Sequence, residues 1–272
     1  MITYPNAKIN LGLNVVERRQ DGYHNIETIF YPIGIQDVLS VEPSETCSDY
    51  SFSSSGISLD GDSENNLIVK AYRLLRSQYQ FSPVDIMLHK QIPFGAGLGG
   101  GSSDAAFMLK ALNELFQLKI TTKKLEQLSA KLGADCPFFI RNKPVYATGI
   151  GNVFTPVDLS LRGYWLLLVK PDIHVSTAEA YAGITPAPSE VPLTELIQRP
   201  MEEWKNTIGN DFEKTVFSSQ PEIGKLKEQI YELGALYASM SGSGSSVYGI
   251  FREKPDFKGM FGTSYVACGE CD

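Results

Sequence analysis

The stretch KQIPFGAGLGGGSSDAAFMLKALNELF, residues 90–116, decides the fold. Its first half carries glycines at positions 95, 97, 99, 100 and 101 followed by two serines, and its second half has apolar residues at helical spacing. Glycine allows positive φ and has no Cβ to hold a ligand away, so successive backbone N–H groups can converge on an anion. Because the loop runs into a helix N-terminus, which also attracts negative charge, the stretch predicts a phosphate-binding site.

Two common phosphate motifs do not account for this loop. Gly95, Gly97 and Gly100 have the spacing G-x-G-x-x-G, but a dinucleotide fold needs a strand after the helix, and a second helical pattern follows here. Gly101 stands where a Walker A motif has its lysine, and the H-R-D and D-F-G segments of protein kinases are missing. The alternative is a flexible loop whose serine only caps the helix. We favour phosphate because ordering so many glycines costs conformational entropy.

The segments before the loop contain both strand and helix patterns. Residues 7–15 alternate between apolar and polar side chains, as a half-buried strand does, and residues 26–35 also have strand character. The Ser-rich residues 44–58 are typical of loops. Residues 65–79 have the apolar spacing of a helix, and residues 84–90 predict a strand that ends at the loop.

The segments after the loop continue this mixture. We expect helices over 104–118 and 123–132, the second capped by Thr122, and later helical segments over 193–233. The predicted strands are residues 164–171, 235–239 and 247–251, with a glycine-serine turn over 240–246. Because the spacing is not that of a doubly wound sheet, the chain is predicted to form two α+β domains, residues 1–158 and 159–272.

Composition narrows the class of protein. The chain has 24 Lys and Arg against 31 Asp and Glu, a net charge of -7, so it offers no electrostatic footprint for nucleic acid. The N-terminus has no basic segment before an apolar one, and no apolar run approaches the ~20 residues of a membrane helix. We therefore expect a cytoplasmic protein with no nucleic-acid or membrane partner. The four cysteines are expected to be reduced and are given no role.

The loop PFGAGLGGGSSDAA, residues 93–106, resembles the phosphate loop of the GHMP kinases, the superfamily of galactokinase, homoserine kinase and mevalonate kinase. PNAKINLGLNV at 5–15 resembles the first motif of that family, and SMSGSGSSVYGIF at 239–251 resembles the third. The resemblance implies an N-terminal domain with the ribosomal S5 domain 2-like fold and a C-terminal ferredoxin-like domain, with ATP and substrate meeting between them. It leaves only DFKGMF, residues 256–261, for the last helix of the family.

Within the family, several segments are most similar to the kinases of a cytidine diphosphate-linked methylerythritol in non-mevalonate isoprenoid biosynthesis. The discriminating segment is RRQDGYHNIETIF, residues 18–30. A pyrimidine has faces to stack on and a polar edge, which an aromatic residue beside a histidine can recognise. The alternatives are a surface hairpin tip, another small-molecule kinase of the family acting on homoserine or mevalonate, and a non-catalytic binding protein. Further similar segments are AKINLGLNV, GLGGGSSDAA, KLGADCPFF and ATGIGNVFTPV.

The resemblance also implies the catalytic residues. ATP would phosphorylate the 2-hydroxyl of the methylerythritol moiety, with Asp135 as the base and Lys8 beside it. A neighbouring ammonium keeps a carboxylate ionised and stabilises charge on the attacking oxygen. The alternatives are that Asp135 caps the segment starting at Cys136, and that Lys8 lies on a solvated strand face.

The remaining predicted residues bind substrate or nucleotide. Mg²⁺ is expected with ATP, Ser102 or Ser103 is expected at a phosphate or a magnesium-bound water, and no protein metal ligand is assigned. Lys90 has the alternative of a side chain that only extends from a strand end. The predicted substrate-binding residues are Asn10, Tyr23, His24, Phe30 and Tyr181. Asn10 is expected to hold the substrate or the catalytic pair, and the resemblance implies that Tyr23, His24 and Phe30 line the cytidine pocket, with Tyr181 closing its opposite face. The predicted nucleotide-binding residues are Asn66, Lys90, Pro93, Phe94, Gly95, Ala96, Gly97, Leu98, Gly99, Gly100, Gly101, Ser102 and Ser103.

Overall fold

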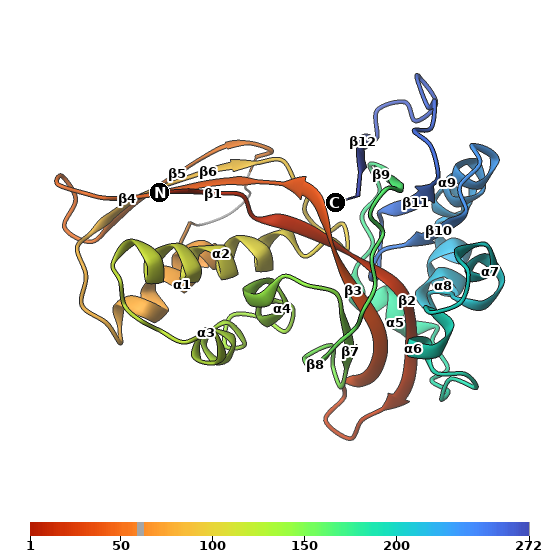
Figure 1. Cartoon of the computed structure of the whole chain (residues 1–272), viewed down its shortest axis with the longest axis horizontal. Coiled ribbons are helices and arrows are strands. Elements are labelled where there is room, and N and C mark those ends of the chain that lie inside the picture. The colour runs from red at the N-terminus through yellow and green to blue at the C-terminus, as the bar shows by residue number, and fades with distance from the viewer. Residues whose placement is uncertain (59–62, 272) are drawn as a thin grey trace. The chain divides into compact units, whose positions relative to one another are not determined.

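The computed structural model describes residues 1–58 and 63–271, and the chain divides into two compact units. The first unit comprises Met1–Ala7, Ile35–Phe94 and Gly99–Lys143, and the second comprises Lys8–Gly34, Gly95–Leu98 and Pro144–Asp272. Figure 1 labels their helices and strands. The middle of the glycine loop therefore belongs to the second unit and its two flanks to the first. The domain boundary between residues 158 and 159 stays a proposal about the family domains.

The sheet of the first unit has the strand order β1-β4-β6-β5. Its strands are β1 (Ile2–Thr3), β4 (Val38–Pro43), β5 (Tyr50–Gly56) and β6 (Val84–Lys90). Neighbours are antiparallel except that β5 pairs in parallel with β6. The prediction of loops over 44–58 was wrong for β5. This exposed edge strand is held by backbone hydrogen bonds to β6, and these form whatever the strand preference of the side chains.

The helices of the first unit carry the flanks of the loop. They are α1 (Leu67–Arg76), α2 (Gly100–Leu115), α3 (Thr122–Ser129) and α4 (Cys136–Arg141), preceded by the short 3₁₀ helix η1 (Ser63–Asn65). Helices α1 and α2 pack against each other below the sheet in the view of Figure 1. Helix α2 begins four residues earlier than predicted, since the glycines run directly into its first turn. Thr121, and not Thr122, caps α3 by accepting a hydrogen bond from the Lys124 amide at 3.3 Å.

The second unit contains two four-stranded sheets. The first has the order β2-β3-β7-β8, formed by β2 (Asn6–Arg18), β3 (His24–Gln36), β7 (Val145–Thr148) and β8 (Val153–Pro156), with the far ends of β2 and β3 in the first unit. The other is antiparallel with the order β10-β11-β9-β12, formed by β9 (Trp165–Lys170), β10 (Tyr237–Met240), β11 (Val247–Phe251) and β12 (Tyr265–Glu270). The glycine-serine turn joins β10 to β11, as predicted.

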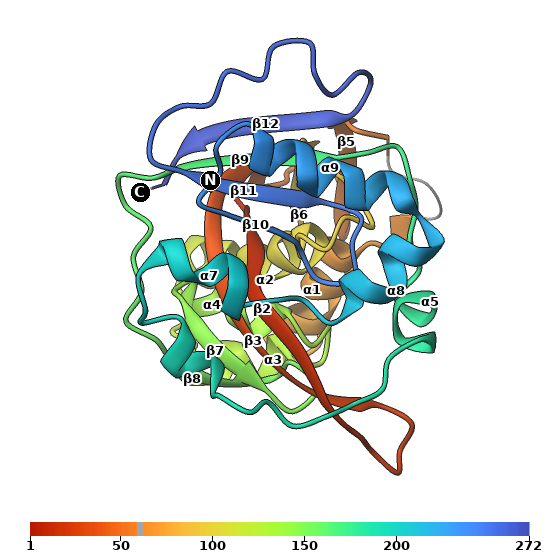
Figure 2. The same ribbon diagram turned by 90° about the vertical axis from the view of Figure 1, so that its right-hand side faces the viewer.

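The second unit also contains the helices α5 (Thr177–Ala182), α6 (Leu193–Leu196), α7 (Met201–Thr207), α8 (Phe212–Ser219) and α9 (Pro221–Glu232). Helix α9 lies across β10 and β11 (Figure 2), α7 contacts β10, and α8 packs against α9 and α5. Buried Val216, Ile223 and Ile230 share one core with Leu167 and Met240. None of the helices that the structure describes has the length and apolar content needed to cross a bilayer.

The prediction of a last helix within DFKGMF was wrong. The segment forms turns, and Gly259 adopts φ 74°, a conformation that a right-handed helix cannot contain. The chain then continues as β12, which pairs with β9 from Tyr265 opposite Lys170 to Glu270 opposite Trp165. A strand that follows the predicted helix segment therefore completes the sheet.

Candidate active site

The glycine loop has a backbone that side chains would not permit. Gly95, Gly97 and Gly99 adopt φ of 57°, 73° and 69°, and Gly99 is the N-cap residue of α2. A Cβ on Gly97 would lie 1.9 Å from the carbonyl oxygen of Ser241, which is far shorter than any non-bonded contact between two such atoms. The glycines therefore serve both positive φ and close backbone contact, which a flexible surface loop would not require.

The carbonyl group of Gly97 is fixed by two donors. It accepts hydrogen bonds from Lys8 Nζ at 2.9 Å and from Ser241 Oγ at 2.9 Å, while the backbone amide of Lys8 donates to Leu98 O at 3.0 Å. In a trans peptide the C=O and the following N–H point in opposite directions. The Leu98 amide is thus turned away from Lys8 and Ser241, and Leu98 itself is 1% exposed. Ser241 was not predicted as a site residue, although its glycine-serine turn was recognised.

Lys8 is buried, with 3% of its surface exposed, so the alternative of a solvated strand face is wrong. Its ammonium donates to Asn10 Oδ1 at 2.6 Å and lies 4.9 Å from the centre of the Phe30 ring. The Asn10 amide is in turn held by a hydrogen bond to Thr28 Oγ1 at 2.9 Å. A buried ammonium needs such partners to offset its lost hydration. The contacts of Asn10 fix the position of Lys8.

The first unit brings a loop serine close to the predicted base. The Ser102 hydroxyl is hydrogen-bonded to the thiol of Cys136, the residue that follows Asp135 and begins α4. Burial raises the pKa of Cys136 to about 11, so this thiol stays protonated near neutral pH. Ser103, by contrast, is fully buried, and its hydroxyl has no hydrogen-bond partner among the residues that the structure describes. Only Ser102 is partly exposed, and contact of either serine with a ligand stays a prediction.

Asp135 occupies the N-cap position of α4 but does not cap it. Its side chain makes no hydrogen bond to the first turn, and the residue is half-buried. The alternative that Asp135 serves as a helix cap is therefore not met, because a capping carboxylate accepts a hydrogen bond from the helix amides. Lys8 and Asp135 belong to different compact units, so their pairing stays a prediction.

Lys90 and Asn66, also predicted to bind the nucleotide, have side chains that are hydrogen-bonded to other residues of the protein. Lys90 is 1% exposed, and its ammonium donates to Asp37 Oδ2 at 2.5 Å and Asp104 Oδ2 at 2.6 Å. Asn66 caps α1, with its Oδ1 accepting from the Ile68 amide at 2.9 Å. Direct contact of Lys90 or Asn66 with a nucleotide stays a prediction, and the two aspartates around Lys90 carried no signal in the sequence.

The predicted cytidine-binding residues are partly assembled. The rings of His24 and Tyr181 are stacked with centroids 4.6 Å apart and planes at 18°, and Phe212 meets Tyr181 edge-on at 4.7 Å. Because His24 and Tyr181 contact each other, a cytosine between them would require the rings to move apart. The role of Tyr181 on the opposite face stays a prediction.

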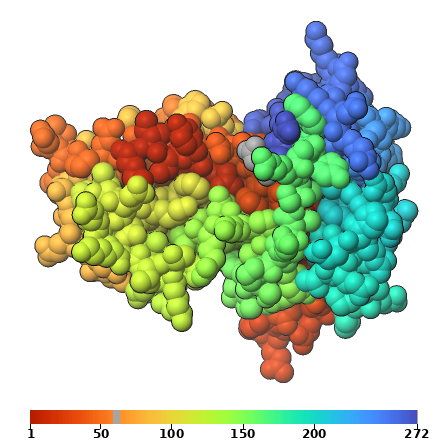
Figure 3. Space-filling view, in the orientation of Figure 1, coloured from red at the N-terminus to blue at the C-terminus, as the bar shows by residue number. Residues whose placement is uncertain are grey.

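The other two aromatic residues lie in different surroundings. Phe30 is buried against the Lys8 ammonium and the ring of Phe154, whose centroid is 6.1 Å away. Tyr23 is 62% exposed in the turn between β2 and β3, which projects from the second unit in the space-filling view (Figure 3). His174 packs near the loop, since a Cβ on Gly95 would lie 3.3 Å from its Nδ1.

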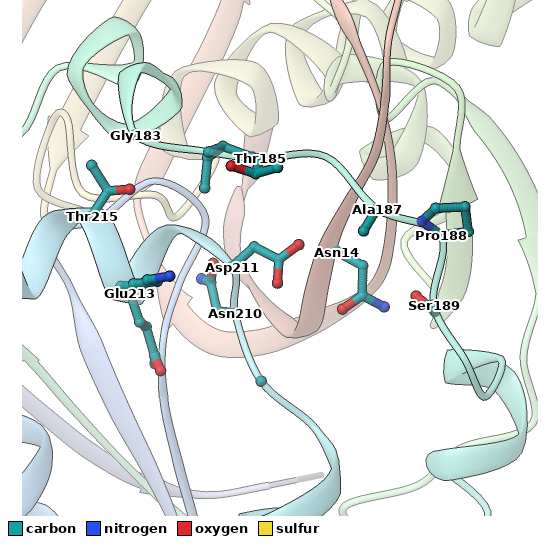
Figure 4. Close-up of a pocket in the computed structure, with 13 residues that line it drawn as sticks. Asn14, Gly183, Thr185, Ala187, Pro188, Ser189, Asn210, Asp211, Glu213 and Thr215 are labelled. Atoms are coloured by element: carbon teal, nitrogen blue, oxygen red, sulfur yellow. The ribbon is translucent and has the colours of Figure 1, made fainter.

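The second unit also contains a polar pocket of about 550 Å³ that the sequence analysis did not anticipate. Its lining comes from Asn14 on β2, from segment 183–189 after α5 and from residues 209–215 at the start of α8. Figure 4 shows the side chains of Asn14 and Asp211 facing the same space. The three contributing segments are far apart in the chain, so no local motif marks the pocket. In the described residues, no group of three or more His, Cys, Asp or Glu is arranged to hold a metal ion.

Comparisons with known proteins agree with this fold. The GHMP kinases N terminal domain matches residues 66–143, and the GHMP kinases C terminal domain matches residues 193–258. A curated relative from Bacteroides fragilis, named 4-diphosphocytidyl-2-C-methyl-D-erythritol kinase, is 55% identical over 96% of this chain and 97% of its own. A relative of the same name from Parabacteroides distasonis is 57% identical over 95% and 94%.

Solved structures extend the comparison. A crystal structure of 4-(cytidine 5'-diphospho)-2C-methyl-D-erythritol kinase has a TM-score of 0.80 at 34% identity, covering 92% of this chain and 90% of that chain. A mevalonate kinase has a TM-score of 0.72 at 13% identity, covering 100% and 99%, and at that identity it shows the fold alone. These matches define a small-molecule kinase. The chain belongs to the GHMP kinase family, and the predicted α+β fold is confirmed.

Proposed function

We propose that this kinase transfers the γ-phosphoryl group of ATP to the 2-hydroxyl of 4-diphosphocytidyl-2-C-methyl-D-erythritol, a step of non-mevalonate isoprenoid biosynthesis in the cytoplasm. The observation that carries the substrate assignment is the stacked pair of His24 and Tyr181. It offers a flat ring surface together with a hydrogen-bonding imidazole, which suits a pyrimidine. The names of the relatives that are 55–57% identical over nearly the whole chain support the same substrate.

Asp135 is the proposed base. As the oxygen of the 2-hydroxyl attacks the γ-phosphorus, its proton passes to the Asp135 carboxylate, the bond from the γ-phosphorus to the bridging oxygen breaks, and ADP leaves. The carboxylate is suited to this role because it is half-buried and is not used to cap α4. A tertiary alcohol is a crowded nucleophile, so its orientation relative to the phosphorus contributes much of the rate.

Lys8 is proposed to stabilise negative charge on the attacking oxygen and on the ionised base. Its ammonium is held by Asn10 and the Gly97 carbonyl in a position with little solvent, where a fixed charge acts more strongly than in water. Asn10 is a positioning residue in this scheme, since its side-chain oxygen is already bonded to Lys8.

The loop is proposed to bind the ATP phosphates through its amides and the α2 N-terminus. Mg²⁺ usually binds to proteins through substrate phosphates and one or two protein oxygens, which suits this site. Ser102 fits as one such oxygen because it lies in the first turn of α2 and is partly exposed, and Asp104 does not, since its carboxylate is buried. When bound, Mg²⁺ would neutralise charge on the phosphates.

The proposal is tested by the position of the product phosphate. Wild-type protein incubated with ATP, Mg²⁺ and the cytidyl substrate is expected to give a product whose ³¹P NMR spectrum contains a new phosphomonoester signal assigned to the 2-position. The Asp135→Asn variant in the same mixture should give no such signal over the same time. A phosphate on another hydroxyl, or turnover of homoserine or mevalonate in preference, would contradict the assignment.

A further inference from the structure

A buried cluster of three charged side chains lies at the base of the glycine loop in the first unit. Lys90 Nζ donates to Asp37 Oδ2 at 2.5 Å and to Asp104 Oδ2 at 2.6 Å. The three side chains are 0–5% exposed. Burying charge at this depth costs free energy that an apolar cluster of the same volume would not, so the cluster calls for an explanation beyond stability.

The cluster holds the chain where it enters the loop. Lys90 is the last residue of β6, and Asp37 Oδ1 accepts hydrogen bonds from the next two amides, those of Gln91 at 2.6 Å and Ile92 at 2.8 Å. One carboxylate thus fixes the lysine through one oxygen and the entering backbone through the other. This arrangement leaves residues 91 and 92 little freedom.

The same cluster holds the chain where it leaves the loop. Asp104 lies in the first turns of α2, so its bond to Lys90 ties the start of that helix to the end of β6. Gly100 lies directly over the lysine: a Cβ there would be 3.1 Å from Lys90 Nζ and 2.8 Å from a methyl carbon of Ile92. The start of α2 is therefore packed against the charged cluster without any side chain between them.

We propose that Asp37, Lys90 and Asp104 form a positioning network that fixes the two ends of the phosphate loop at the separation and orientation needed to bind ATP. Lys90 acts through the two aspartates and not by contact with phosphate. A loop that is ordered before binding loses less conformational entropy when the ligand arrives, so the network contributes to nucleotide affinity. This inference rests on the use of ATP in the proposed function.

One carboxylate oxygen of the network, Oδ1 of Asp104, does not bind the lysine. Asp104 Oδ1 is buried and has no hydrogen-bond partner within residues 1–58 and 63–271, although the two carboxylates face a single ammonium. An unpaired buried charge is costly, and neutralising this carboxylate removes that cost. An asparagine at position 104 would keep the shape and the oxygen that accepts from Lys90, which makes Asp104→Asn the conservative variant of the network.

The test compares four variants of the full-length protein: Lys90→Met, Asp37→Asn, Asp104→Asn and the control Lys110→Met. Lys110 lies on α2, as Asp104 does, but its ammonium lies over the Phe107 ring and takes no part in the network. The readouts are the ADP dissociation constant by calorimetry, the midpoint of thermal unfolding, and hydrogen exchange of the amides of residues 91–103.

The network predicts a specific pattern. Lys90→Met and Asp37→Asn should each weaken ADP binding on the order of tenfold and speed amide exchange over 91–103, while Lys110→Met leaves both unchanged. Asp104→Asn should keep ADP affinity within about threefold of wild type, because the bond to Lys90 survives. Asp37→Asn keeps the test decisive if Lys90→Met does not fold.

The opposite pattern would overturn the inference. If Lys90→Met and Asp37→Asn lower the unfolding midpoint but bind ADP as wild type does, the cluster only supports the core. Failure of the proposed function is distinguishable from this outcome, because it would appear as ADP binding by wild-type protein without turnover of the cytidyl substrate.

Discussion

The imidazole ring of His24 lies flat on the phenol ring of Tyr181, with 4.6 Å between the ring centroids and 18° between the planes. The two residues come from the first position of β3 and from the short helix α5. Phe212 supports the tyrosine from its edge, at 4.7 Å. The pair is the proposed site for the cytosine ring, which would lie between the two rings once they move apart.

Removing either ring is expected to weaken binding of the cytidyl substrate. In His24→Ala and Tyr181→Leu, the KM for 4-diphosphocytidyl-2-C-methyl-D-erythritol should rise about tenfold, as expected for one lost base-stacking contact. The KM for ATP should change little. Steady-state kinetics with each substrate varied in turn measures both values.

Tyr181→Phe serves as the control for the ring itself, since it keeps the stacking surface and removes only the hydroxyl. It should behave as wild type does. Equal KM values for the cytidyl substrate in wild type, His24→Ala and Tyr181→Leu would show that cytosine is bound elsewhere in the molecule.

Replacing the proposed base should separate catalysis from binding. Asp135→Asn is expected to lower kcat on the order of 10²–10⁴-fold, the usual contribution of a positioned base. The midpoint of thermal unfolding should stay close to that of wild type, because the carboxylate makes no capping bond in α4. The exposed Asp158→Asn is the matched control and should retain full activity. A fully active Asp135→Asn variant would remove this residue from the mechanism.

Gly97 and Gly259 offer a matched pair for testing the loop geometry. Both have nearly the same φ, 73° and 74°, but a Cβ on Gly97 would lie 1.9 Å from Ser241 O, and nothing lies within 4 Å of a Cβ on Gly259. Gly259→Ala should lower the free energy of unfolding by about 1–2 kcal/mol through backbone strain alone.

Gly97→Ala should lower the free energy of unfolding more than Gly259→Ala does, because the clash with Ser241 is added to the backbone strain. It should also weaken ADP binding. Urea unfolding and calorimetry measure the two effects. Identical losses of stability in the two alanine variants, with ADP affinity intact, would mean that close approach of the loop to Ser241 is unimportant.

Much of this architecture could be predicted from local patterns. The strands at residues 7–15 and 164–171 and the helix after the glycine loop were predicted from patterns a few residues long. The prediction that residues 7–15 form a half-buried strand was wrong in one respect, because both faces of β2 are covered from Asn6 to Leu13. Strand β5 was missed because a serine-rich edge strand is held by backbone pairing, and no strand was predicted over the residues of β12, which follow the segment 256–261 left for a helix.

The candidate site was less accessible to sequence analysis for a physical reason. Lys8 and the loop could be recognised by their motifs, but the partners that orient them are distant in the chain. Ser241 reaches the Gly97 carbonyl, and Asp37 reaches Lys90, across more than fifty residues in each case. Such contacts follow from tertiary packing, and a single aspartate before a strand carries no pattern that reveals them.

The buried network should make stability depend on pH. Burial raises the pKa of Asp104 from 3.8 to about 7, against the opposing effect of Lys90 and with a further contribution from Asp37. Between these two values the folded protein binds a proton that the unfolded chain has released, so the free energy of unfolding should fall as pH rises from about 4 to about 7.

The Asp104→Asn variant removes this titration and should show a flatter decline over the same pH range. Chemical unfolding of both proteins at several pH values measures the difference, with Lys110→Met as a control that should follow wild type. Parallel curves for wild type and Asp104→Asn would show that Asp104 titrates in the folded protein as it does in the unfolded chain.

This GHMP kinase is proposed to phosphorylate a cytidine diphosphate-linked methylerythritol. The most direct test is the rate of ADP release by the purified wild-type protein with ATP, Mg²⁺ and, in separate reactions, 4-diphosphocytidyl-2-C-methyl-D-erythritol, homoserine or mevalonate. We predict turnover with the cytidyl substrate and none above background with the other two. Equal or faster turnover of homoserine or mevalonate, or no turnover of the cytidyl substrate by protein that binds ADP, would contradict the account.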